Sequence, residues 1–541
     1  MTSGSSTKTT CVSCASSEPR ARWLGIPGWA WLLLLTTLTG SYCVGASFSG
    51  SFRECYTAII ARNLWQDGPA GLLWPRIDWL GGGPGYMVQE FPFYVAAVAS
   101  LYGLLGEHEW LGQVVSLAFS LGGVLLLYGI VRRVDGERTA LTAGVLMALT
   151  PLQQYIGQVF MPEPLMMLLF NGAVYAMLRH AQNGQGRWLA LAVVAAAGSM
   201  LVKAPAGIAV LVALAYLAWT RDGWSCWRRP ALWLALAVAM GSYLLWQWHS
   251  DRVNAVYYPS YVSSSAEARN WFLGPLALRL DWHFYARIAG RLVVYLSPLI
   301  ALAAVAGLFR RPAGPQGWLF HVWLAGNGGY VLLCANLHFA HKYYQIVFVP
   351  IAATLAARAV VALWPRWRCA LVGAAAALVL YDGAIACKLW REQRDPRIER
   401  AGALVRQVTA PQDLLLVADF HASGGTRENH WNVPTRLYVA GRRGWNVPLY
   451  AEFDAALVER YRRQGARWLL VDVMVTDERG GVGAGKDKSA GWHRILKLAG
   501  MTSPELTRPD EKLLKITDEL TRRYRCVQSA DGIFLFDLGG N

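Results

Sequence analysis

Four parts of the chain hold acidic, basic and aromatic side chains whose types could carry out group transfer. The first is the segment 51–64 with Arg53, Glu54 and Arg62, and the second is the Gly-rich segment 75–92 with Asp78 and Glu90. The third is Pro162-Glu163. The fourth is a basic group made of two segments, one containing Lys203 and the other His341-Lys342-Tyr343-Tyr344. A carboxylate can deprotonate a hydroxyl as a general base. Lysine and arginine can hold and neutralise a phosphate leaving group. Such a set is what the transfer of a sugar from a lipid phosphate would need.

Each of these residues also has an ordinary structural interpretation. Glu54 and Arg62 could form an exposed ion pair of little consequence, and Glu163 could simply mark the end of an apolar segment. Lys203 could be a snorkelling anchor at a membrane interface, and His341-Lys342 could be another. The convergence of all four parts on one face of a membrane, developed below, favours the chemical interpretation.

The composition indicates a membrane protein. The 541 residues are 54% hydrophobic and only 16% charged, whereas a soluble globular chain has about 25% charged residues. The net charge of +16 does not indicate nucleic acid binding, because many basic residues lie in hinges between apolar runs, where they set membrane orientation.

Eleven apolar runs before residue 388 predict membrane spans, each near the length of about 20 residues that crosses a bilayer. They are roughly 23–46, 114–131, 139–155, 164–178, 188–202, 204–219, 231–248, 292–309, 318–335, 345–363 and 369–387. A further run, 91–105, is flanked by Glu90, Glu107 and Glu109 and could cross the membrane or lie along it.

Basic hinges at alternate ends of these runs fix the predicted orientation. They hold Arg132 and Arg133, Arg179 and Arg187, Arg221, Arg228 and Arg229, Arg310 and Arg311, and Arg366 and Arg368. If all are cytoplasmic together with the N-terminus, the positive-inside rule is obeyed throughout. This requires eleven spans, with 91–105 in the outer interface. We expect a multi-pass protein of the cytoplasmic (inner) membrane, with a disordered cytoplasmic tail over 1–22 and an uncleaved first span.

The composition changes near residue 388, and the segment 388–541 is predicted to be a small α/β domain. Buried strands are expected at 413–418, 468–473 and 532–536, and a helix at 455–464. On the predicted topology this domain and the four polar parts lie outside the cytoplasm.

At the polar segments the sequence resembles the GT-C glycosyltransferases of the protein mannosyltransferase and lipid A aminoarabinose transferase superfamily. It looks most like bacterial members that use polyprenyl-phosphate sugars. The resemblance covers most of 23–363 and rests on the order and spacing of several motifs. These are Ala58 to Asn63 after an acidic position, Pro162-Glu163, the turn Val202-Lys203-Ala204-Pro205, and His341 to Pro350.

The resemblance implies a fold and a set of roles. The fold is an all-α GT-C membrane bundle over 23–387, with about 11–12 transmembrane helices and juxtamembrane helices in the first outer loop, joined to the outer α/β domain. Arg53 stands where many members have aspartate, so the base role passes to Glu54, with Glu163 as its competitor. The implied phosphate contacts are Lys203, His341, Lys342 and Arg62, and the implied substrate contacts are Arg53, Asp78, Glu90, Tyr343 and Tyr344.

The implied reaction is an inverting single displacement from a polyprenyl-phosphate sugar to a lipid, glycan or protein acceptor of the cell envelope. A divalent ion beside Glu54 and Glu163 is left open, and oxygen ligands would suit Mg²⁺ or Mn²⁺.

Three other classes remain as alternatives. A transporter would place ionisable residues within its spans and show repeat symmetry, but Arg358 and Asp382 are the main such residues here and no repeat is visible. An O-antigen-ligase-type enzyme would use a pyrophosphate carrier. A membrane-anchored sensor or scaffold would explain the outer domain but not the polar segments.

Overall fold

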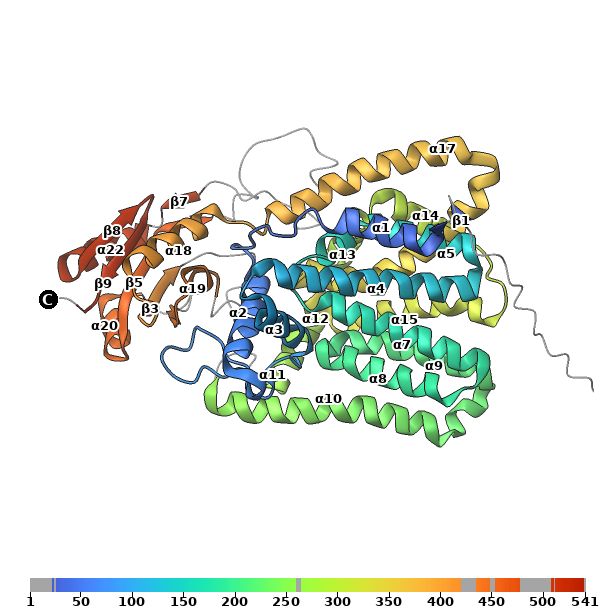
Figure 1. The fold of residues 1–541 in the computed structure, drawn as a ribbon, viewed down its shortest axis with the longest axis horizontal. Coiled ribbons are helices and arrows are strands. Elements are labelled where there is room, and N and C mark those ends of the chain that lie inside the picture. Colours follow the sequence, from blue (N-terminus) through green and yellow to red (C-terminus); the bar gives the residue numbers. More distant parts are fainter. Residues whose placement is uncertain are drawn as a thin grey trace, which may run out of the picture.

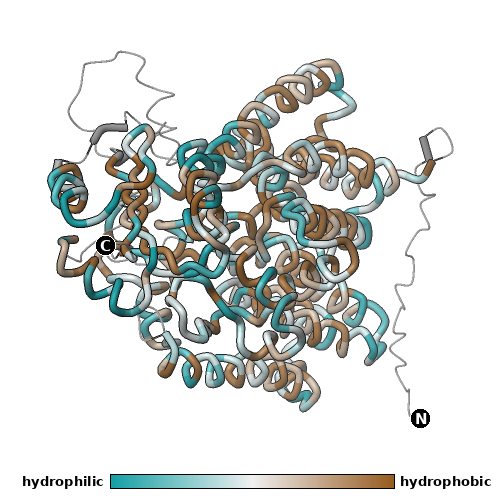
Figure 2. The backbone as a smooth tube through the Cα atoms, turned by 60° about the vertical axis from the view of Figure 1, so that its left-hand side comes forward, coloured by the Kyte–Doolittle hydropathy of each residue, from teal (hydrophilic) through white to brown (hydrophobic). Residues whose placement is uncertain are grey.

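The structure, a computed structural model, describes residues 22–23, 26–258, 264–419, 434–447, 453–476, 507–509 and 511–539. It consists of a bundle of helices and a smaller α/β domain at one end (Figure 1). The predicted N-terminal tail, residues 1–22, lies almost entirely outside the described residues. Hydrophobic residues dominate the helices of the bundle (Figure 2).

Long helices run along the bundle and are joined by short turns at its two ends (Figure 1). Glycines in positive-φ conformations follow α4 at Gly136 and α7 at Gly184, where the chain must reverse sharply. The helices of the bundle are α1 (Gly28–Gly40), α4 (Glu109–Asp135), α5 (Glu137–Leu149), α7 (Glu163–Asn183), α8 (Gly186–Val202), α9 (Ala204–Asp222), α10 (Pro230–Tyr257), α13 (Trp282–Tyr295), α14 (Pro298–Leu308), α15 (Leu319–Leu333) and α17 (Val349–Arg391).

Length and composition alone qualify fewer helices as membrane spans than the eleven predicted. Among the described residues, three helical segments are long and apolar enough to cross a bilayer: Glu109–Asp135, Pro230–Tyr257 and Lys342–Val408. The bent pair α13 and α14 would add a fourth, and α1, α8 and α3 (Phe93–Leu105) are shorter apolar helices. The 13 residues of α3 rise only about 20 Å, too little to cross the hydrocarbon core alone. The total of eleven spans stays a prediction.

One predicted span is wrong in form. The apolar run 292–309 is divided between α13 and α14, which meet at an angle of 107°. Ser297 between them has a φ of 75°, and Pro298 begins α14. A proline disfavours helical geometry at the residue before it, which accounts for the break at Ser297. Hydropathy alone does not reveal this break, because the residues on both sides of it are apolar. The predicted boundary between runs 345–363 and 369–387 is matched by non-helical backbone at Trp367 inside α17.

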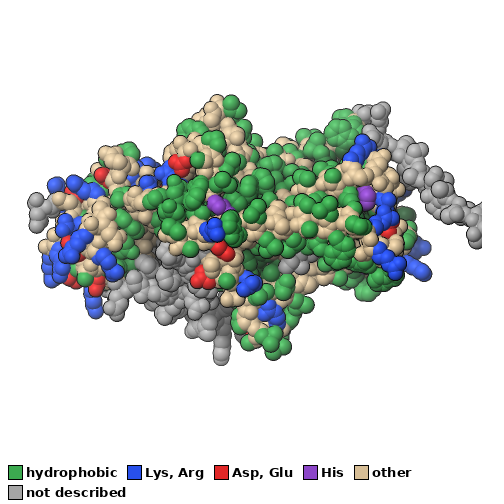
Figure 3. All heavy atoms as spheres, turned by 90° about the horizontal axis from the view of Figure 1, so that it is seen from below, with side chains coloured by type: hydrophobic (Ala, Val, Ile, Leu, Met, Phe, Trp, Pro, Cys, Tyr) green, Lys and Arg blue, Asp and Glu red, His purple; other side chains and the backbone are tan. Residues whose placement is uncertain are grey.

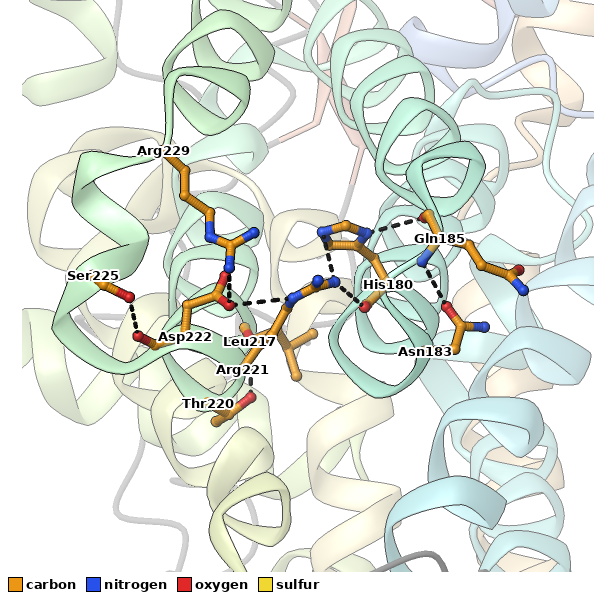
Figure 4. A network of polar contacts seen from close by, with 9 residues as sticks. All are labelled: His180, Asn183, Gln185, Leu217, Thr220, Arg221, Asp222, Ser225 and Arg229. Atoms are coloured by element: carbon orange, nitrogen blue, oxygen red, sulfur yellow. Dashed lines mark hydrogen bonds and ion pairs between the residues drawn. The ribbon is translucent and has the colours of Figure 1, made fainter. Parts of the chain in front are cut away.

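On the face of the molecule seen in Figure 3, basic side chains gather at both ends and hydrophobic side chains cover most of the surface between them. At the end of the bundle away from the α/β domain, several of them are tied into a polar network (Figure 4). Arg221 Nη1 donates to His180 O at 2.8 Å, and Asp222 Oδ1 lies 3.3 Å from Arg221 Nε and 2.6 Å from Arg229 Nη2. These bonds join the ends of α7, α9 and α10, so this network is structural.

Shorter elements occupy the opposite end, between the bundle and the α/β domain. Here α2 (Phe52–Asp67) and α3 lie across the ends of the long helices (Figure 1). The other short elements include η1 (Gly68–Leu72), α6 (Pro151–Ile156), α11 (Ser265–Leu273), α12 (Leu276–Leu280), α16 (Ala335–Ala340) and η4 (Lys342–Phe348). The predicted juxtamembrane helices of the first outer loop are therefore present.

The C-terminal domain is built on a five-stranded sheet in the order β4-β3-β5-β9-β8. β3 (Leu414–Asp419) pairs in parallel with β4 (Gly444–Asn446) and β5 (Ala466–Asp472), whereas β9 (Ile533–Asp537) is antiparallel to β5 and to β8 (Arg525–Ala530). The predicted strands correspond to β3, β5 and β9, and the predicted helix to α20 (Ala455–Arg463). The other helices are α18 (Pro396–Val408), α19 (Thr435–Ala440) and α22 (Glu511–Arg523), and the short strands β6 (Met474–Thr476) and β7 (Thr507–Pro509) pair separately.

The loop between η1 and α3 is joined to the edge of this sheet. Gly81 N donates to Gly444 O at 2.7 Å, and Gly444 N donates to Asp78 O at 2.9 Å. Leu80 forms an antiparallel bridge with Trp445 in β4. The loop that carries Glu90 is thereby held by the C-terminal domain as well as by the bundle.

Candidate active site

Four charged side chains from separate parts of the chain meet at the end of the bundle that carries α2 and α3 (Figure 1). Arg53 lies in the first turn of α2, Glu90 in the loop before α3, Glu163 at the start of α7, and Lys203 between α8 and α9. Arg53 is paired with Glu90. Lys203 Nζ lies 2.5 Å from Glu90 Oε1 and 3.2 Å from Glu163 Oε1. Two cations and two carboxylates thus form one connected cluster, which we call the charged cluster.

Mutual pairing keeps Arg53, Glu90 and Lys203 ionised despite their burial. Burial alone would raise the pKa of Glu90, but the charges of Arg53 and Lys203 outweigh it and lower the pKa to about 2. Burial, and for Lys203 also the nearby charge of Arg53, would lower the pKa of the two cations; the carboxylates of Glu90 and Glu163 outweigh these effects and raise it. A phosphate entering here would meet two fixed positive charges that already have carboxylate partners.

Aromatic rings and a recess border the charged cluster. Lys203 Nζ lies 5.4 Å from the centre of the Tyr344 ring and 6.0 Å from that of Tyr343, and Arg53 lies over Tyr56 at 4.9 Å. A small recess is lined by Glu90, Tyr56 and ten other residues. Six of the residues predicted from sequence are brought together here: Arg53, Glu90, Glu163, Lys203, Tyr343 and Tyr344.

Glu54 lies beside this cluster but faces different neighbours. Its side chain is 1% exposed, and its Oε2 accepts a hydrogen bond from Phe160 N at 2.8 Å. Burial raises the pKa of Glu54 to about 7, against the lowering effect of the Phe160 hydrogen bond and with a contribution from the charge of Glu109. Glu54 lines a second, small recess, which we call the Glu54 recess.

The start of α2 explains why Arg53 and Glu54, adjacent in the sequence, face different neighbours. Ser51 caps the helix, its side chain accepting a hydrogen bond from Glu54 N at 3.4 Å. Successive residues of a helix point about 100° apart. Arg53 therefore meets Glu90, whereas Glu54 meets the loop between α6 and α7.

Arg62 and Asp78 lie in another network. They are paired with each other, and Asn63 Nδ2 donates to Asp78 Oδ1 at 3.0 Å. Arg62 also lies 5.7 Å from the ring of Tyr438 in the C-terminal domain, whose hydroxyl donates to Glu109 at 2.7 Å. The structure gives both residues partners that hold the segment between α2 and α3 against the C-terminal domain. The predicted phosphate contact of Arg62 and the predicted substrate contact of Asp78 stay predictions.

His341 and Lys342 lie at the start of η4. Lys342 Nζ is 2.7 Å from Glu392 Oε2, just beyond α17, and 6.0 Å from the ring of Tyr155. The His341 ring stacks on Tyr343 with centres 5.1 Å apart. His341 thus contacts the aromatic border of the charged cluster, whereas Lys342 has a separate carboxylate partner.

Within the described residues, no group of three or more His, Cys, Asp and Glu side chains is arranged to hold a metal ion. Glu163, one of the two carboxylates considered for Mg²⁺ or Mn²⁺, is paired with Lys203.

Several residues of the site escaped the sequence reasoning. Gln113, Tyr155, Gln158 and Trp390 line the Glu54 recess, although they lie within or beside apolar runs. The two glutamines were the available signal, because a buried amide at the end of an apolar run needs hydrogen-bond partners. Trp390 carried no such signal.

The fold defines a class of protein. The chain has the fold of the GT-C glycosyltransferases, and it is a multi-pass integral membrane protein. A family model described as dolichyl-phosphate-mannose-protein mannosyltransferase matches residues 90–248, which include Glu90, Glu163 and Lys203.

Three solved structures carry the likeness in fold. ArnT from Cupriavidus metallidurans bound to undecaprenyl phosphate is similar at a TM-score of 0.61 and 15% identity, covering 94% of this chain and 97% of that one. The apo state of the same protein gives 0.55, with the same identity and coverage. An oligosaccharyltransferase from Archaeoglobus fulgidus gives 0.51 at 13% identity, covering 82% of this chain and 69% of that one. No curated protein sequence matches the chain.

Proposed function

We propose that this protein transfers a sugar from a polyprenyl-phosphate donor to a hydroxyl acceptor at the outer face of the membrane, by an inverting single displacement. The observation that carries the proposal is the charged cluster, in which Arg53 and Lys203 are buried beside Glu90 and Glu163 at the end of the bundle. The ArnT structure bound to undecaprenyl phosphate supports the choice of a polyprenyl-phosphate donor.

In this proposal Arg53 and Lys203 neutralise the phosphate as it leaves. They act from a buried site, where electrostatic interactions are stronger than in water. Because both cations are paired with Glu90, the donor phosphate must replace that carboxylate as their partner. The charged cluster therefore selects an anionic group, either monoanionic or dianionic. Until that group binds, Glu90 holds Arg53 and Lys203 in place.

Glu54 is the proposed general base. A base works best when its pKa lies near the operating pH, and burial holds the pKa of Glu54 at about 7. Glu163 is the competitor, but its carboxylate already faces the Lys203 ammonium at 3.2 Å, which favours a role in orienting that cation.

The test uses the full-length protein in lipid nanodiscs with a panel of polyprenyl-phosphate hexoses and pentoses. Release of polyprenyl phosphate is measured for the wild type, Glu54→Gln and Glu163→Gln, with the exposed Glu107→Gln as the matched control. We expect Glu54→Gln to lower release by about 10²–10⁴-fold while Glu107→Gln leaves it unchanged.

Two results would change the assignment. Full release by Glu54→Gln together with loss in Glu163→Gln would move the base to Glu163. Failure of undecaprenyl phosphate to bind the wild type, or equal binding to Lys203→Ala, would refute the donor class itself.

A further inference from the structure

The C-terminal end of α10 is hydrogen-bonded to the loop that carries Glu90. Val88, two residues before Glu90, is paired with a single amide: its N–H donates to Asn254 Oδ1 at 2.9 Å, and its carbonyl accepts from Asn254 Nδ2 at 2.7 Å. Ser250 Oγ donates to the same carbonyl at 2.6 Å, and Trp246 Nε1 donates to the carbonyl of the next residue at 2.8 Å. We call Trp246, Ser250 and Asn254 the α10 clamp.

The α10 clamp accounts for most of the residues that α10 buries. This helix runs along the edge of the bundle (Figure 1), and three of its five buried residues are the members of the clamp. They are spaced four residues apart, so they lie on one face of the helix. Buried polar side chains need hydrogen-bond partners, and here the backbone of the loop before Glu90 supplies them.

The backbone of Glu90 is also held on its other side. Phe91 N donates to Leu201 O at 2.9 Å, and Leu201 lies two residues before Lys203, the cation that Glu90 meets at 2.5 Å. Because the residues on both sides of Glu90 are bonded to α10 and α8, its backbone is fixed and its side chain keeps the remaining freedom. A group tethered in this way stays at a high effective concentration beside its partner.

Glu90 is the carboxylate of the charged cluster that an incoming anion meets first. Its side chain is 27% exposed and borders the recess beside the cluster, whereas the side chain of Glu163 is 1% exposed. Glu90 also contacts both cations, Arg53 and Lys203. Arginine and lysine bind carboxylates and phosphates through the same kind of charge-assisted hydrogen bond, so Glu90 competes with a phosphate for these two cations.

The two cations have contacts besides Glu90. Lys203 Nζ lies 3.2 Å from Glu163 Oε1, and Arg53 lies over the ring of Tyr56 at 4.9 Å. Removing the Glu90 carboxylate would therefore leave both positive charges near their places with one anion fewer to balance them. Such a pair of charges attracts a phosphate more strongly than the neutralised cluster does.

We propose that Glu90 is a built-in competitor that displaces the polyprenyl-phosphate product, and that Asn254 is the positioning residue that holds Glu90 beside Arg53 and Lys203. The inference rests on the function proposed above and adds a role for Glu90 after transfer. The donor phosphate takes the two cations from the Glu90 carboxylate when it binds. Once the sugar has been transferred, the carboxylate pairs with the cations again and the product leaves. This exchange moves ion pairs only, and no proton is transferred in it.

Loss of this competitor has a kinetic signature that general damage to the site does not share. Donor and product should both bind more tightly, so KM for the donor and kcat should fall together while product release limits turnover. A variant that merely distorts the site should instead lower kcat/KM.

The first experiment measures binding of undecaprenyl phosphate without acceptor, by native mass spectrometry of the full chain in nanodiscs. Glu90→Gln should bind this lipid about 10-fold more tightly than the wild type does, and Asn254→Leu about 3- to 5-fold more tightly. The double variant should match Glu90→Gln, because Asn254 acts through Glu90. Asn171→Leu is the matched control and should bind as the wild type does. Asn171 is a fully buried amide of α7 that donates to a backbone carbonyl of α4 at 3.1 Å.

A gentler pair of variants keeps the test decisive if Asn254→Leu does not fold. Ser250→Ala removes one hydrogen bond to Val88, whereas Ser242→Ala removes a hydroxyl that donates to Ala239 O within α10 itself. In steady-state release assays with the donor panel, Ser250→Ala should lower KM and kcat together, and Ser242→Ala should change neither.

The outcomes separate this inference from the proposed function. Binding of undecaprenyl phosphate by Glu90→Gln that is equal to or weaker than that of the wild type would overturn the inference, as would additive effects in the double variant. Tighter binding by Glu90→Gln in a protein that transfers no sugar would refute the proposed function, yet it would confirm that Glu90 competes for the phosphate site. A wild type that does not bind undecaprenyl phosphate would refute both.

Discussion

Replacing Glu54 by glutamine should make the folded protein more stable at neutral and alkaline pH while abolishing its proposed activity. Burial raises the pKa of Glu54 from 4.5 to about 7. A carboxyl whose pKa is higher in the folded protein contributes stability that is fully present below its unfolded pKa and is lost as the pH rises through its folded pKa. The cost of ionising Glu54 should therefore appear between about pH 4.5 and pH 7 and then stay constant.

The size of the effect follows from the shift. One pKa unit corresponds to about 1.4 kcal/mol, so a change from 4.5 to about 7 gives an upper estimate of about 3 kcal/mol above pH 7. Glutamine has nearly the same shape as the protonated acid and does not ionise. The stability difference between Glu54→Gln and the wild type should be close to zero at about pH 4 and should reach its plateau at about pH 8.

The assay is thermal unfolding of both proteins in nanodiscs over this pH range, with the midpoint Tm as the readout. Glu107→Gln is the control, because Glu107 is exposed and its replacement should leave the pH dependence unchanged. A Tm difference that does not grow with pH would show that Glu54 is ionised at acidic pH. The recess would then be better hydrated than its burial indicates, and the argument for a base tuned near neutral pH would fail.

Three further outcomes are expected. The rate of polyprenyl-phosphate release should fall about tenfold per pH unit below pH 7, because Glu54 must lose its proton to act; a rate independent of pH between 5 and 7 would contradict this. Lys203→Ala should destabilise the protein by about 3 kcal/mol in unfolding measurements, because it removes the buried cation that pairs with Glu90 and Glu163. The double variant Lys203→Met/Glu163→Gln should recover part of this stability but should show no release of polyprenyl phosphate. Gly81→Ala should lower both the stability and the release of polyprenyl phosphate, because Gly81 has a φ of 71° and an added Cβ would lie 2.2 Å from the Trp445 ring. The control is Gly83→Ala, whose added Cβ would meet nothing closer than 3.9 Å. This control should behave as the wild type.

Local patterns in the sequence were enough to predict the helices and strands and most of the chemically active side chains. Apolar runs placed the bundle helices, and β-branched and leucine-rich segments placed β3, β5 and β9, because hydropathy and periodicity are properties of neighbouring residues. The prediction of one continuous span over 292–309 was wrong because a backbone break at Ser297 leaves hydropathy unchanged. The order of the motifs around Glu54, Glu163 and Lys203 indicated the GT-C fold that the solved structures share.

Which of these groups meet was decided only by the tertiary structure. Glu90 and Lys203 are far apart in the chain yet pair at 2.5 Å, whereas Arg62, eight residues from Glu54, turns to Asp78 and the C-terminal domain. Trp390 joins Glu54 in one recess because α17 ends beside α2 and α6. Sequence spacing fixes the direction of a side chain only within its own helix or strand, so contacts between elements depend on how the whole bundle packs.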